Sequence, residues 1–181
     1  MKVIFLDHDG VICLSDNWGS RFKKKGYDSN PETPLDIRMD NFDNKAVKVL
    51  KEIIDETGCE IVISSDWKLH GTLDQMKEMY VTREVKPPID YTPNMKDFDE
   101  DGYGLFRWKG FNEAIRVCEV NEYLKNHPEV THWVAVDDLN MGKIGEPWKD
   151  VWAIDNFVLT PRSSEGIKQS GIKEKILKFL T

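Results

Sequence analysis

The chain has few cysteines, no long apolar run and no excess of positive charge, and each absence excludes a class of protein. Its 3 cysteines, Cys13, Cys59 and Cys118, form no CxxC pair, so neither a thiolate zinc site nor a disulfide framework is expected. No apolar run approaches the roughly 18 residues of a membrane-spanning helix. A net charge of -7 argues against a protein that coats nucleic acid or an anionic membrane.

The remaining composition is typical of one globular domain. Hydrophobic residues make up 40% and charged residues 31% of 181 residues, which is enough chain to bury a core without cross-links. The first residues lead directly into an apolar segment followed by acids, a pattern unlike a signal peptide. We therefore expect a single cytoplasmic domain spanning 1–181.

Apolar runs and amphipathic segments alternate along this domain. Besides the apolar run before Asp7, strands are predicted at 60–63, 86–92, 132–136 and 151–154, and helices at 41–56, 69–79, 111–125 and 171–180. This alternation predicts an α/β fold, a Rossmann-like parallel sheet with helices on both faces. Two turn-rich stretches, 14–40 and 93–106, are predicted to be loop insertions, and the second is expected to be exposed.

Polar side chains follow three of the predicted strands. Ligands of such sheets bind beyond the carboxyl ends of the strands, so these side chains should converge. Residues two apart share one face of a strand, and two converging carboxylates repel unless a cation or a proton lies between them. His8 should point to the opposite face and have a packing role. The side chains are Asp7 and Asp9, Ser64 and Ser65, and Asp137 and Asp138.

A cluster of oxygen ligands without histidine or thiolate favours Mg2+ over zinc. One carboxylate could attack phosphorus as a nucleophile, and a second could act as acid and then base. Each piece also has a plainer explanation: Asp9-Gly10 is a common turn, and Ser65 or Asp66 could cap a helix. Because all three pairs of polar residues follow strands in order along one sheet edge, a catalytic site is favoured.

These residues resemble the motifs of the haloacid-dehalogenase-like (HAD) phosphohydrolases. Asp7-His8-Asp9-Gly10-Val11 after an apolar strand is similar to motif I, Ser64 to motif II, and Asp137-Asp138 to the acidic motif IV. The resemblance implies that Asp7 is the nucleophile and that Asp9 is both the general acid/base and a metal ligand. An acid at Asp9 favours a phosphatase over a dehalogenase.

The same resemblance implies the other ligands of the site. Asp137 would hold Mg2+ directly, and Asp138 directly or through water, together with Asp7. Ser64 and the Ser65 amide would bind the phosphate.

Motif III of the family is a lysine or arginine near the start of the helix that precedes motif IV. Both Arg116 and Lys109 are candidates, and Arg116 is the preferred one. The strings Ser64-Ser65-Asp66-Trp67-Lys68 and Arg116xxGlu119 are also similar to the small RNA-repair-associated branch of the family, a neighbour of polynucleotide 3'-phosphatase domains. That branch more often has arginine in place of Lys68.

Four further residues are predicted to contact a substrate, because aromatic rings can stack on bases and cations can bind phosphates. They are Trp18, Arg21, Trp67 and Lys68. The resemblance implies that 14–40 is a flap or small cap, and the alternative is an ordinary solvated loop around Trp18.

The expected activity is Mg2+-dependent hydrolysis of a phosphomonoester, with a nucleotide or nucleic-acid end as a candidate substrate and no obligate protein partner. A non-catalytic Mg2+ and phosphate-binding module and a phosphotransferase are the rival functions.

Overall fold

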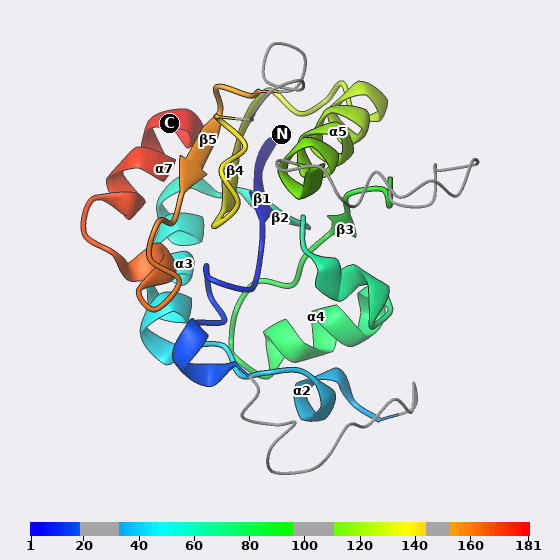
Figure 1. Ribbon diagram of the computed structural model, residues 1–181, viewed down its shortest axis with the longest axis vertical. Helices are drawn as coiled ribbons and strands as arrows, with labels where there is room; N and C mark the ends of the chain where they lie inside the picture. The colour runs from blue at the N-terminus through cyan, green and yellow to red at the C-terminus, as the bar shows by residue number, and fades with distance from the viewer. Residues whose placement is uncertain (19–32, 96–110, 144–152) are drawn as a thin grey trace.

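The core of the molecule is a 5-stranded sheet with strand order β3-β2-β1-β4-β5 (Figure 1). The computed structural model describes residues 1–18, 33–95, 111–143 and 153–181. Every pairing of neighbouring strands is parallel, which confirms the predicted Rossmann-like α/β fold. The strands are β1 (Lys2–Leu6), β2 (Glu60–Ile63), β3 (Asp90–Tyr91), β4 (His132–Asp137) and β5 (Phe157–Leu159).

Helices cover both faces of this sheet. The α-helices are α2 (Leu35–Arg38), α3 (Asn44–Thr57), α4 (Leu73–Val81), α5 (Phe111–Asn126) and α7 (Ile172–Leu180), and the short 3-10 helices are η1 (Ser15–Asn17), η2 (Asp66–Leu69) and η5 (Gly166–Lys168).

Local chemistry determines where α3 begins and ends. The Asp43 carboxylate accepts hydrogen bonds from the first-turn amides of the helix, and Gly58 ends it with a φ of 68°.

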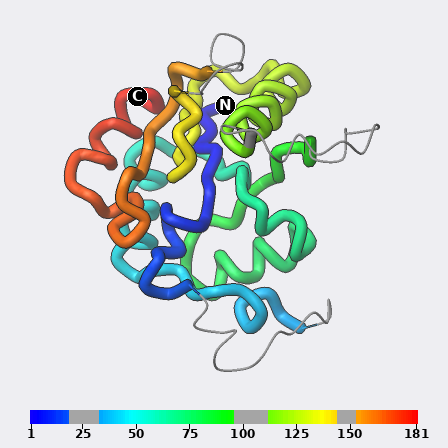
Figure 2. The backbone as a smooth tube through the Cα atoms, viewed as in Figure 1, coloured from blue at the N-terminus to red at the C-terminus, as the bar shows by residue number. Residues whose placement is uncertain are grey.

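The central strand β1 divides its side chains between two cores. Ile4 and Leu6 pack with α3 and α7 on one face, whereas Val3 and Phe5 pack beneath α5 on the other. Although α3 and α7 are far apart in the sequence, they pack against each other on one side of the sheet, as Figure 2 shows. Since both faces are covered, the buried part of a strand here must be apolar, as Val3 to Leu6 of β1 are.

The last predicted strand, 151–154, is not confirmed where it is described. Residues 151 and 152 lie outside the described residues, 153 and 154 are not in a strand, and the fifth strand is Phe157–Leu159. Asp155 and Asn156 form the bend that precedes it, and Val158 then pairs beside Val136. Ile154 is buried in the core beneath α5 without joining the ladder, so its apolar character did not indicate a strand.

The predicted edge strand at 86–92 is confirmed but shorter, Asp90–Tyr91. Pro87 and Pro88 lack the amide protons that a longer ladder would need. The predicted insertions at 14–40 and 93–106 are described only in part: η1 and α2 belong to the first, and residues 19–32 and 96–110 lie outside the described residues. Within the described ranges, no helix is long and apolar enough to cross a membrane.

Candidate active site

The carboxyl ends of β1, β2 and β4 lie at the same level of the sheet. Leu6, the last residue of β1, is in register with Ile63 on one side and Val136 on the other. The ladder continues one step further, because the Asp7 amide donates to the Val136 carbonyl and the Ser64 amide donates to the Leu6 carbonyl. Parallel pairing therefore brings the three predicted motifs to one edge.

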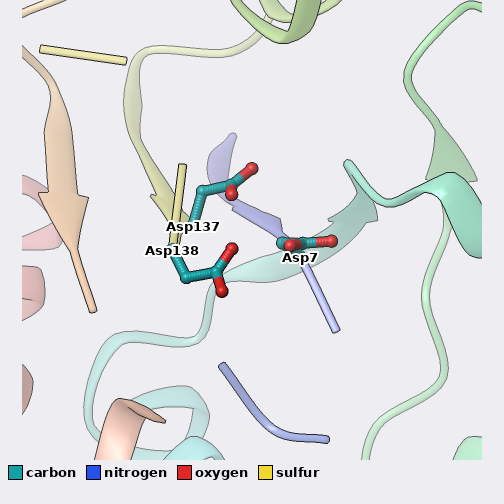
Figure 3. Close-up of side chains that lie close together, drawn as sticks. All are labelled: Asp7, Asp137 and Asp138. Carbon is teal, nitrogen blue, oxygen red and sulfur yellow. The ribbon is translucent and has the colours of Figure 1, made fainter. Parts of the chain in front are cut away.

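Three carboxylates converge at this edge. Asp7, Asp137 and Asp138 each place one carboxylate oxygen within 4.8 Å of the others (Figure 3). Burial raises the pKa of Asp7 to about 6 against the opposing effect of Arg116, and burial and the neighbouring Asp7 raise the pKa of Asp137. Asp137 Oδ2 is buried and has no hydrogen-bond partner among the described residues. This oxygen-only set, which includes a buried acceptor without a hydrogen bond, fits a hard divalent cation.

Arg116 on α5 supplies the positive charge of the site. Its guanidinium lies 3.6 Å from Asp7 Oδ1 and 3.8 Å from Asp137 Oδ2, and it also contacts Asp66 Oδ1 at 3.2 Å. It donates a further hydrogen bond to the carbonyl of Ser64. Of the two residues predicted for motif III, Arg116 lies beside Asp7, whereas Lys109 lies outside the described residues.

The second acid of motif I lies apart from this carboxylate group. Asp9 is not one of the three clustered carboxylates, and its Oδ2 accepts a hydrogen bond of 2.9 Å from the indole of Trp67. Burial raises the pKa of Asp9, against the effect of that hydrogen bond. His8 points to the opposite face as expected, where it is fully buried with Nε2 2.7 Å from the Tyr80 hydroxyl.

The two serines at the end of β2 are almost fully buried. The Ser65 hydroxyl accepts a hydrogen bond from the Trp67 amide and begins η2. The Ser64 hydroxyl has no hydrogen-bond partner within the described part of the chain. A buried hydroxyl without a partner is uncommon, and it leaves a donor free at the end of β2.

These groups surround a cavity of about 220 Å³. Five carboxylate and hydroxyl side chains and one guanidinium contribute to its wall, so the cavity suits a small, strongly polar group better than an apolar ligand. Its lining residues are Asp7, Asp9, Ser65, Asp66, Asn112, Ile115, Arg116, Asp138 and Leu139.

The four residues predicted to contact a substrate have different positions. Trp18 is 43% exposed, and its indole donates to the Cys13 carbonyl. Trp67 is 3% exposed and faces Asp9. The Lys68 side chain is only 4% exposed and pairs with Glu119, which argues against direct contact with a substrate. Arg21 lies outside the described residues.

Sequence reasoning missed the residues after β5 that support the site. The Ser163 hydroxyl donates a 3.0 Å hydrogen bond to Asp138 Oδ2, and the Thr160 hydroxyl donates to the Gly10 carbonyl. Gly10 has a φ of 69°, and a side chain there would overlap the Asp138 carboxylate. No local pattern links these residues to the acids, because Ser163 is 25 positions beyond Asp138.

One of three comparisons with known proteins finds a match, and this match agrees with the arrangement described above. Neither a search of curated proteins nor a search of solved structures finds a match. Residues 3–171, which include all the motifs described above, match the family described as the HAD domain in Swiss Army Knife RNA repair proteins. The match spans most of the chain and agrees with the parallel sheet and the buried acidic group, so the chain belongs to this family of HAD domains.

Proposed function

We propose that the protein is a Mg2+-dependent phosphatase that hydrolyses a phosphomonoester through a covalent phosphate ester of Asp7. The observation that carries the proposal is the position of Asp7, a buried carboxylate at the floor of a polar cavity and 3.6 Å from the Arg116 guanidinium. A carboxylate in that place can attack a bound phosphate, and the arginine can neutralise the charge that both bring.

Asp7, Asp137 and Asp138 would hold the Mg2+ ion. Asp9, whose side chain lies apart from these three, would add a further oxygen ligand through its backbone carbonyl. The ion would neutralise charge on the phosphate and help to orient it. Burial raises the pKa of all three clustered carboxylates even though Arg116 opposes the shift, so a bound cation would offset part of the cost of burying their charges.

In the first step, a carboxylate oxygen of Asp7 forms a bond to phosphorus, and the bond from phosphorus to the ester oxygen breaks. The leaving oxygen takes a proton from Asp9, whose raised pKa favours the protonated form that this step needs. Ser64 and Ser65 would donate to the phosphate oxygens, with Arg116 beside them.

In the second step, Asp9 is a carboxylate and accepts a proton from water as the water oxygen attacks phosphorus. The bond between phosphorus and Asp7 breaks, inorganic phosphate leaves, and both aspartates return to their starting forms. The polar cavity leaves the phosphoaspartate accessible to water, which favours hydrolysis over transfer to another acceptor.

The family suggests a nucleic-acid end as the source of the phosphate. A panel of 3'-phosphorylated oligonucleotides, 5'-mononucleotides and phosphopeptides tests this part of the proposal. Preference for the oligonucleotides would support it, and equal turnover of all three classes would contradict it.

Asp7→Asn is expected to abolish turnover of p-nitrophenyl phosphate with Mg2+, with a loss of about 10⁴-fold or more, because an amide cannot form the covalent ester. Circular dichroism and thermal unfolding should show that the variant is folded. Beryllium fluoride should bind the wild type and not the variant. An active Asp7→Asn protein would exclude the covalent mechanism, and a wild type that binds Mg2+ without turnover would favour the binding module.

A further inference from the structure

A buried ion pair lies behind Arg116, outside the lining of the cavity. Lys68 Nζ is 2.6 Å from Glu119 Oε2, and the two side chains are 4% and 2% exposed. The same ammonium donates to the Thr92 hydroxyl and to the Pro93 carbonyl, each at 3.0 Å. Its three protons therefore have three acceptors within the fold, and none remains for a substrate.

Glu119 lies three residues after Arg116 on α5. Residues at this spacing are neighbours on a helix surface, so an unoccupied Glu119 carboxylate would be a ready partner for the guanidinium. Arg116 instead turns toward the sheet edge, where Asp7, Asp66 and Asp137 surround it. Lys68 and the Met95 amide take up the two oxygens of Glu119.

A buried pair of this kind adds little stability compared with apolar side chains of the same size, because both charges lose their hydration. Its electrostatic effect on the neighbours is direct, however. Glu119 attracts Arg116 in the same sense as the carboxylates at the sheet edge do, and the paired Lys68 ammonium offsets part of this competing attraction.

We propose that Lys68 is a positioning residue that, by occupying Glu119, keeps the Arg116 guanidinium directed at Asp7 and at the substrate phosphate. This role rests on the proposed phosphatase function. The same contacts connect η2, α5 and the segment after β3, because Lys68, Glu119 and Thr92 come from these three parts of the chain.

Lys68→Met should free Glu119 to attract Arg116 and lower kcat/KM for p-nitrophenyl phosphate by at least about tenfold. Glu119→Gln alone should cost about threefold or less, because the glutamine has no charge to compete for Arg116. Adding Glu119→Gln to Lys68→Met should restore most of the lost activity, and Lys68→Arg should retain it. If Lys68→Met does not fold, Lys68→Gln, which keeps an uncharged donor, replaces it.

Lys173→Met is the matched control. Lys173 Nζ is also 2.6 Å from a glutamate, Glu56, but this pair joins α7 to α3 away from the cavity. Its loss should leave kcat/KM unchanged. Urea unfolding of each variant separates stability from turnover: a purely structural role for Lys68 predicts lower stability with normal turnover of the folded protein.

A crystal structure of the Lys68→Met protein gives a readout independent of activity. The guanidinium of Arg116 should lie within about 4 Å of Glu119, and Glu119→Gln in the same chain should return it to Asp7. An Arg116 that stays beside Asp7 in Lys68→Met, or normal turnover by this variant, would overturn the inference. If the wild type hydrolyses no phosphomonoester, the proposed function fails, and the position of Arg116 in the variant still decides the inference.

Discussion

At the residue scale, the buried indole ring of Trp67 contacts the carboxylate of a neighbouring acid, Asp9. Its indole nitrogen holds one oxygen of Asp9 at 2.9 Å, and its ring packs between Phe42 and His8. The Cys13 side chain is a second hydrogen-bond partner of the Asp9 carboxylate. We therefore predict that Trp67 acts through Asp9, whereas its sequence position beside Ser64 and Ser65 predicted contact with a substrate.

Trp67→Phe should keep the ring packing and lose the hydrogen bond to Asp9. We expect kcat to fall about tenfold for an alkyl phosphate, whose leaving oxygen needs a proton, and less for p-nitrophenyl phosphate, whose leaving group needs little help. Steady-state kinetics with both substrates measures the difference. Equal losses for the two substrates would show that Trp67 does not act through Asp9.

At the scale of elements, the segment after β5 supports the site from the side opposite α5. It contacts the motif I turn through Thr160 and the acidic pair through Ser163. The Ser163 hydroxyl holds Asp138 Oδ2, which leaves the other oxygen of that carboxylate for a cation. Such supporting hydrogen bonds orient metal ligands and raise affinity.

Ser163→Ala should therefore raise the Mg2+ concentration for half-maximal activity by about tenfold, while kcat at saturating Mg2+ changes little. Ser163→Thr keeps the hydroxyl and serves as the control. The increase in melting temperature with added Mg2+ gives a second measurement that does not require turnover. An unchanged Mg2+ requirement in Ser163→Ala would remove Ser163 from the site.

At the scale of the whole molecule, burial makes folding sensitive to pH through His8. Burial lowers the pKa of His8 from 6.5 to about 3, so the folded protein keeps this ring neutral where an unfolded chain would bind a proton. As pH falls from 6.5 toward 3, the unfolded state gains protons that the folded state does not, and the free energy of unfolding decreases. The raised pKa of Asp7 acts in the opposite direction.

Comparison with His8→Gln isolates the histidine contribution from that of the aspartates. Between pH 7 and pH 5, the wild type should lose about 2 kcal/mol of stability relative to this variant. Urea unfolding at the two pH values measures the difference. A difference between the two proteins that does not change with pH would mean that His8 is protonated in the folded state.

The sequence by itself determined the order of the main strands and helices and the polar residues that follow three strands. These properties depend on local patterns, such as the apolar run before Asp7 and the caps at Asp43 and Gly58, and parallel topology then brings the strand ends together. The fifth strand escaped prediction because the short run at 157–159 is no more apolar than the segment before it.

Only the tertiary structure decided which side chains meet at that edge. Arg116 reaches Asp7, Trp67 reaches Asp9, and Ser163 reaches Asp138 across large sequence separations. Such contacts depend on how helices dock and how side chains orient, and no local periodicity encodes either. Lys68 is the clearest case: a cation beside Ser64 and Ser65 predicted a substrate contact, whereas in the structure its buried ammonium pairs with Glu119 of α5, since a buried charge requires a partner.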